Sequence, residues 1–171
     1  LENSARGVWA LTGKHLNSNS VEIKYAVEEA SVTADWRERI NKFLIETLSP
    51  DAFERLVQRV LRETGFSQVE ITGRAGDGGI DGKGIARING ILSFRVVFQC
   101  KRYRGAVGSA AIRDFRGAMQ GRADKGLFIT TGYFTREAIK EATRDGAIAI
   151  DIVDGEKLAE KLKELSLGVK I

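Results

Sequence analysis

The stretch FRVVFQCKRY, residues 94–103, decides the fold of this chain of 171 residues. Its first half is apolar enough for the central strand of a sheet, in which successive side chains point to opposite faces. Gln99 and Lys101 therefore share one face, and Cys100 points to the other. A lone lysine in such a strand costs free energy unless it has a purpose. The stretch predicts a central strand that carries functional side chains.

A hairpin is predicted immediately before this stretch. Two strands, Ile80–Ile88 and Leu92–Tyr103, flank the pair Asn89-Gly90, which is a favoured two-residue hairpin turn. Six glycines fall within residues 73–84, a density that indicates a loop of special backbone conformation. A short apolar strand around 69–71 precedes that loop.

Helices and strands alternate outside the hairpin. An amphipathic helix is expected over 33–48, and a second begins with Ser49 as N-cap and Pro50 in its first turn and ends at Gly65. The predicted elements after the hairpin are a helix carrying Ile112, Phe115 and Met119, a strand at 127–130, a helix from Thr135, a strand at 147–153 and a helix at 156–165. This order predicts the α/β class, with a mixed sheet covered by helices.

Charge and composition exclude several classes of protein. The net charge is +4, and residues 82–122 hold nine basic residues and one acidic residue, which is either a phosphate-facing surface or an ordinary solvated face. No segment approaches the ~18 apolar residues of a membrane helix, so we expect a cytoplasmic protein. One cysteine excludes an internal disulfide, and His15 alone excludes nuclease sites built on paired histidines. The start lacks an initiator methionine and a signal peptide, which suggests a fragment.

Four side chains could together form a site that hydrolyses a phosphodiester: Asp81, Gln99, Glu54 and Lys101. Asp81 and the Gln99 amide oxygen offer the oxygen ligands that Mg²⁺ takes, and Glu54 could add a further carboxylate. Lys101 could orient the attacking water, accept its proton or neutralise developing charge. Asp77 is a further carboxylate in the glycine-rich loop.

Other chemistries fit less well. Gly82-Lys83-Gly84 resembles the end of a phosphate-binding loop, but no Ser or Thr follows the lysine. Cys100 is expected to pack in the core rather than to act as a nucleophile. Hydroxyls in residues 129–135 could contact phosphate, although Thr135 is more simply a helix N-cap.

Four motifs together resemble the Mrr-type restriction endonuclease catalytic domain, from about Trp36 to the end. They are Phe53-Glu54, residues 76–82 (GDGGIDG), residues 98–103 (FQCKRY) and residues 128–135 (FITTGYFT). This family is a variant of the PD-(D/E)XK nucleases in which Gln replaces the acidic residue before the Lys. The resemblance implies a restriction-endonuclease-like mixed central sheet flanked by helices. It places the metal-binding Asp on Asp81, the Gln on Gln99, the catalytic Lys on Lys101 and the helical Glu on Glu54.

The resemblance also implies a domain organisation. Residues 1–20 resemble the remnant of an N-terminal winged-helix domain and a linker, because 6–12 read as the last strand of such a domain. Residues 21–48 are expected to be a linker and an amphipathic helix, and residues 49–171 the catalytic domain.

The expected function is that of a restriction-type endonuclease that cleaves foreign, possibly methylated, double-stranded DNA with Mg²⁺, for which Mn²⁺ could substitute. We expect a homodimer or higher oligomer on DNA. The candidate DNA-binding residues are Arg74, Lys83, Arg102, Tyr103 and Arg104. A DNA-binding or sensing module without turnover stays open, because the neutral Gln99 binds a cation less strongly than a carboxylate does. A repair or junction nuclease with the same chemistry also stays open.

Overall fold

The computed structural model of the protein describes residues 36–73 and 78–168. Residues 1–38 group as a separate unit, of which only residues 36–38 are described, and the fold below concerns the unit from Arg39 onward. The predicted strand at 6–12, His15, Arg74 and Asp77 lie outside the described residues. No helix in the described part of the chain is long and apolar enough to cross a bilayer.

Two helices come first. The first helix in the described residues runs through Lys42 and ends in a π-helical turn, η1 (Phe43–Thr47). Helix α2 (Pro50–Glu63) begins as predicted, with the Ser49 hydroxyl accepting from the backbone N–H of Ala52 at 3.2 Å.

Three antiparallel strands form the first half of the sheet. They are β1 (Ser67–Ile71), β2 (Gly82–Ile88) and β3 (Leu92–Lys101). The β2–β3 register runs from Gly82 opposite Phe98 to Ile88 opposite Leu92. Asn89 and Gly90 make the predicted turn, with φ of 50° and 71°.

Parallel strands form the second half of the sheet, separated by helices. The remaining elements are β4 (Ala106–Val107), α3 (Ser109–Met119), β5 (Lys125–Thr130), β6 (Tyr133–Phe134), α4 (Arg136–Ala142), β7 (Ile150–Val153) and α5 (Gly155–Glu164). The sheet order is β1-β2-β3-β5-β7, so β3 is the central strand, antiparallel to β2 and parallel to β5. The strands β4 and β6 make a separate two-stranded sheet.

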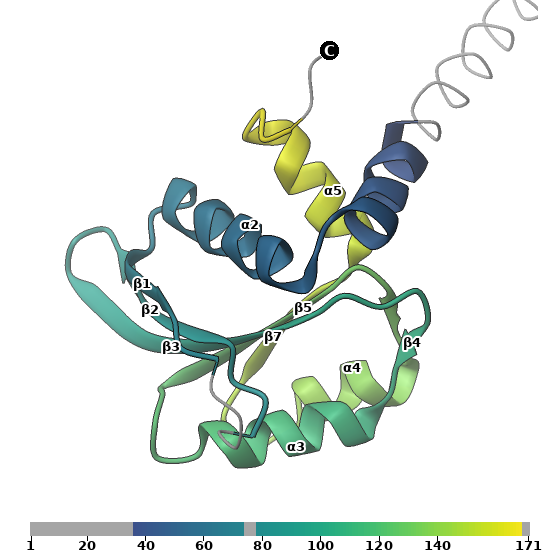
Figure 1. The fold of residues 1–171 in the computed structure, drawn as a ribbon. Coiled ribbons are helices and arrows are strands. Elements are labelled where there is room, and N and C mark those ends of the chain that lie inside the picture. Colours follow the sequence, from purple (N-terminus) through teal and green to yellow (C-terminus); the bar gives the residue numbers. More distant parts are fainter. Residues whose placement is uncertain (1–35, 74–77, 169–171) are drawn as a thin grey trace, which may run out of the picture. The chain divides into compact units, whose positions relative to one another are not determined.

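Helices cover both faces of the sheet. Figure 1 shows α2 and α5 on one side and α3 and α4 on the other. Phe53 of α2, Phe98 of β3 and Leu158 of α5 belong to one buried cluster. Phe115 of α3 and Phe128 of β5 belong to the other. The predicted fold class, a mixed sheet flanked by helices, is confirmed.

The strands that carry the candidate site are shorter than predicted. Strand β2 begins at Gly82 rather than Ile80, and β3 ends at Lys101 rather than Tyr103. Strand β7 begins at Ile150 rather than Ala147. At the first two ends side chains replace the regular ladder, as described below. Apolar alternation continues past such a point, so the pattern alone overestimates the length of β2 and β3, whereas β5 begins at Lys125 and is longer than predicted.

Candidate active site

Asp81 lies where β2 separates from β3. Its backbone N–H donates to the carbonyl of Phe98 at 2.9 Å, which continues the ladder by one bond beyond Gly82. Its carboxylate oxygen Oδ2 then accepts from the backbone N–H of Cys100 at 2.6 Å. A charged acceptor makes this a strong hydrogen bond. The Asp81 side chain thus takes the place of a backbone partner for β3.

Gln99 faces Asp81 across the two strands, because Gly82 pairs with Phe98 and Asp81 is one residue further back. The glycine-rich loop fixes the place of the amide. A Cβ added to Gly79 would lie 2.6 Å from Nε2 of Gln99, so this side chain packs directly on the loop. Gly79 has φ of +87°, a conformation that side-chain-bearing residues rarely adopt. A side chain at position 79 would therefore displace the Gln99 amide and strain the backbone.

Glu54 approaches from α2 and is half-buried. Burial raises the pKa of its carboxyl, the nearby Asp51 raises it further, and Arg55 opposes the shift. A Cβ added to Gly73 would lie 3.9 Å from Oε2 of Glu54, and the N–H of Gly73 donates to the carbonyl of Asp81 at 3.2 Å. The same short segment therefore contacts the surroundings of both carboxylates.

Cys100 carries the backbone N–H that donates to Asp81. Burial raises the pKa of its thiol well above the ordinary value, and the negative charges of Asp81 and Glu54 raise it further. The thiol side packs against the core cluster under α2 and α5, which agrees with a packing role. The negative charges of Asp81 and Glu54 thus both act on this end of β3.

Lys101 is the last residue of β3, and it is exposed. The alternation predicts Lys101 inside a central strand, but Lys101 lies at the end of that strand. The ammonium of Lys101 lies over the ring of Tyr103, 5.3 Å from the ring centroid. The end of β3 thus carries Gln99 and Lys101 on the same face as Asp81.

Two buried threonines hold the chain beyond Lys101. The Thr130 hydroxyl, fully buried, donates to the carbonyl of Lys101 at 2.8 Å. The Thr131 hydroxyl accepts from the N–H of Tyr103 and donates to its carbonyl, both at 2.8 Å. The sequence indicates these hydroxyls only as possible phosphate ligands, and their hydrogen bonds to the backbone of Lys101 and Tyr103 were not predicted. The position of the two threonines at and directly after the end of an apolar strand is the one signal that could have indicated these bonds.

Arg102 and Arg104 both reach the helical segment before α2. Nη1 of Arg102 donates to the carbonyls of Ile45 at 2.7 Å and Leu48 at 2.6 Å, which would otherwise lack partners at a helix end. Arg104 forms an exposed ion pair with Glu46. The structure therefore engages both candidate DNA-binding arginines in contacts within the protein, while Tyr103 stays half-exposed.

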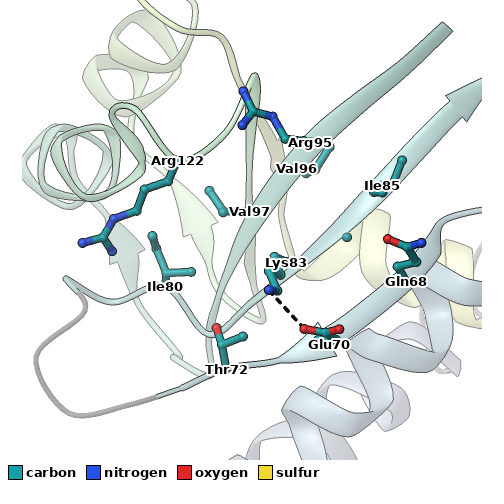
Figure 2. A pocket seen from close by; sticks show the side chains of 11 residues that line it. Gln68, Glu70, Thr72, Ile80, Lys83, Ile85, Arg95, Val96, Val97 and Arg122 are labelled. Atoms are coloured by element: carbon teal, nitrogen blue, oxygen red, sulfur yellow. Dashed lines mark ion pairs between the residues drawn. The ribbon is translucent and has the colours of Figure 1, made fainter.

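Lys83 lines a pocket of about 360 Å³ on the same face of the sheet as Gln99. Figure 2 shows its ammonium directed toward Glu70, with which it forms a 3.2 Å ion pair. Arg95 and Arg122 line the same pocket, and Ile80 and Val97 contribute apolar surface. Three of the basic residues in 82–122 thus line this pocket.

Arg116, another member of that basic run, does not face solvent. It is 9% exposed and forms an ion pair with the buried Glu141. It also donates to the carbonyls of Glu141 at 2.5 Å and Ile148 at 3.3 Å. Its role is to join α3 to the end of α4, so it does not belong to a phosphate-facing surface.

Comparisons with solved structures define the class. AspBHI, a DNA modification-dependent restriction endonuclease, superimposes with a TM-score of 0.65 at 22% identity, over 79% of this chain and 36% of that one. MspJI restriction endonuclease, solved with a 27-mer oligonucleotide, gives a TM-score of 0.56 at 26% identity, over 74% and 30%. The fold is that of restriction endonucleases.

The family follows from the sequence match. A model described as restriction endonuclease, Mrr_cat, matches residues 45–162, and the chain belongs to this family. The resemblance drawn from the four motifs is confirmed.

Two curated relatives are similar over part of their length. The type IV methyl-directed restriction enzyme EcoKMrr of Escherichia coli K12 is 35% identical over 130 residues, which are 71% of this chain and 40% of the relative. An uncharacterized mitochondrial protein of Schizosaccharomyces pombe is 34% identical over 110 residues, 60% of this chain and 44% of the relative. The chain therefore spans less than half the length of both.

Restriction endonucleases generally use divalent metal ions, and the donor set at the end of β3 fits such an ion. In the described part of the chain no three His, Cys, Asp or Glu side chains gather as a metal site. The carboxylates of Asp81 and Glu54 and the amide oxygen of Gln99 nevertheless supply oxygen donors. Mg²⁺ prefers oxygen ligands and commonly keeps several waters, so it needs few protein ligands.

Proposed function

We propose that this chain is the catalytic domain of a Mg²⁺-dependent endonuclease that cleaves double-stranded DNA. The observation that carries the proposal is the placement of Asp81 opposite Gln99, with Lys101 two residues on, in a member of the restriction endonuclease family. Because EcoKMrr is described as methyl-directed, we extend methylated DNA to this chain as its proposed substrate.

The proposed chemistry assigns each residue a role. Asp81, Gln99 and Glu54 would hold Mg²⁺, which when bound would offset the charge of the scissile phosphate. Lys101 is exposed, so its proposed role is that of a cation that orients the water and neutralises developing charge rather than that of a buried base. The residues proposed to contact the flanking DNA are Lys83, Arg102, Tyr103 and Arg104. Arg74 stays a proposed DNA contact that lies outside the described residues.

The assembly is part of the same proposal. Cleavage of both strands needs two active sites or two events, so we propose that two copies act together on DNA. The division into a winged-helix remnant at 1–20, a linker and helix at 21–48 and a catalytic domain at 49–171 is likewise proposed.

The test is cleavage of a supercoiled plasmid, methylated or unmethylated, with Mg²⁺ or Mn²⁺. We expect nicking by the wild type, none by Lys101→Ala, and wild-type nicking by Lys140→Ala, which removes an exposed lysine on α4. Undiminished nicking by Lys101→Ala would contradict the assignment.

One observation favours a second candidate. Gln99 carries no charge, so the proposed site has one negative charge fewer than a site with three carboxylates. A non-cleaving DNA-binding module on this fold would bind DNA without metal and would leave the plasmid intact under every condition. A preference for branched over linear DNA would instead favour a junction nuclease.

A further inference from the structure

No residue of β2 pairs with Lys101. The β2–β3 register ends at Gly82 opposite Phe98, three residues before Lys101. On the other side Lys101 pairs with Thr130, the last residue of β5. A long, exposed lysine at a strand end has many accessible rotamers, and ordering it costs conformational entropy. Some other contact must orient the ammonium if it is to act at one place.

Tyr103 supplies that contact. The ammonium of Lys101 lies over the face of its ring, 5.3 Å from the centroid, which is within the distance of a cation–π interaction. Tyr103 lies two residues beyond the end of β3, and its ring is half-exposed beside the lysine.

The ring of Tyr103 is itself held by its surroundings. The buried Thr131 hydroxyl bonds both the N–H and the carbonyl of Tyr103, which fixes the backbone after the ladder has ended. A Cβ added to Gly105 would lie 2.8 Å from Cε1 and 3.2 Å from Cζ of the tyrosine, so the ring packs on a glycine. The carbonyl of Gly105 accepts from Tyr133 N–H at 3.3 Å, which ties this glycine to β6.

We propose that Tyr103 is a positioning residue for Lys101, its ring held beneath the ammonium by Thr131 and Gly105. This inference rests on the proposed function of Lys101. Tyr103 would then orient Lys101 in addition to any contact with DNA. The buried Thr131 hydroxyl would act on the reaction through the position of Tyr103.

The sharpest test changes the electrons of the ring and leaves its shape nearly constant. Tyr103→Phe and then mono-, di- and trifluorophenylalanine at position 103 progressively weaken the negative face of the ring. In the full chain with saturating plasmid, we expect the single-turnover rate to fall stepwise by roughly two- to five-fold in total, as for one exposed cation–π contact. DNA affinity without metal should stay constant, and Tyr133→Leu, at a tyrosine that is 60% exposed, should cut normally.

Two further measurements separate positioning from mere folding. The ε-methylene protons of Lys101 should show an upfield NMR shift from the ring, lost in Tyr103→Leu. Thr131→Val should slow cleavage with DNA affinity unchanged, and Thr131→Ser, which keeps the hydroxyl, should restore the rate.

Three outcomes would overturn the inference: a flat fluorine series, an unshifted methylene, or a Tyr103→Leu variant that binds DNA less well but cuts at the normal rate when saturated. Cleavage by Lys101→Ala would instead overturn the proposed function. A flat series alongside an inactive Lys101→Ala would overturn the positioning role alone.

Discussion

The side chain of Asp81 acts as a hydrogen-bond partner for the central strand: its Oδ2 accepts from the backbone N–H of Cys100 at 2.6 Å. The proposed metal ligand and the hydrogen-bond partner of the central strand are therefore one carboxylate. Substitutions at this position change the two roles by different amounts.

Asp81→Asn keeps an oxygen that can accept from Cys100 but removes the charge. We expect cleavage to fall at least about 100-fold, with little change in the free energy of unfolding. Asp81→Ala loses the acceptor as well and should also cost about 1.5–3 kcal/mol of stability. Plasmid nicking and urea unfolding measure the two effects. An alanine variant as stable as the asparagine variant would contradict the structural role of the bond.

Glu54 gives the protein a pH-dependent stability. Its pKa is raised above the ordinary 4.5, chiefly by burial, so the folded protein holds this proton more tightly than the unfolded chain does. The stability contributed by the group is complete below pH 4.5 and is lost as the pH rises through the folded-state value.

Glu54→Gln, which stays neutral, should therefore melt at a higher temperature than the wild type at pH 7 without metal. The two melting temperatures should converge below pH 4.5. Added Mg²⁺ should stabilise the wild type more than the variant, because it binds the folded carboxylate. Glu63→Gln, at an exposed position of α2, should show no such difference. An equal shift for both variants would contradict the burial argument.

Gly79→Ala tests the contact between the loop and Gln99. The positive φ should cost about 1–2 kcal/mol of stability, and the new Cβ displaces the amide, so cleavage should fall about tenfold or more. Gly121→Ala is a matched control, since Gly121 has φ of +74° but nothing within 4 Å of the added Cβ. It should lose similar stability and cut normally. Equal losses of cleavage in both variants would remove the role of Gly79.

Arg116 and Glu141 form a largely buried ion pair, with side chains that are 10% and 12% exposed, and without Arg116 the Glu141 carboxylate keeps a longer ion pair, of 3.6 Å, with the exposed Arg144. Arg116→Ala should lower the free energy of unfolding by about 3–5 kcal/mol. Arg104→Ala breaks the exposed pair with Glu46 and should cost only about 0.2–1 kcal/mol. Urea unfolding of the two variants measures the difference. Comparable losses would show that burial does not decide the strength of these pairs.

Local signals predicted much of the fold. The Ser49 cap, the Asn89-Gly90 turn and the Thr135 cap depend on neighbours within a few residues, and each is seen as expected. The alternation in residues 94–103 correctly placed Gln99 and Lys101 on one face of a central strand.

Contacts between distant residues were not predictable in the same way. Arg102 reaches carbonyls more than 50 residues back in the chain, and Thr131 reaches Tyr103 across 28 residues. A spacing pattern describes which residues share a face, but it does not describe which distant backbone groups lack partners. For that reason the contacts that Arg102 and Thr131 make within the protein were not predicted, and the DNA contact of Arg102 stays a prediction.

The contacts of the central strand β3 also indicate that the two halves of the candidate site fold one after the other. Asp81 bonds Cys100 across 19 residues of a hairpin, whereas Lys101 and Tyr103 depend on threonines 29 and 28 residues further on, in and after β5. Longer loops cost more entropy to close, and local pairings form faster. We therefore expect a nascent chain to assemble the Asp81–Gln99 half with its hairpin and to order Lys101 only after β5 has docked. A partly folded nuclease of this kind could bind a metal ion before it could cut DNA.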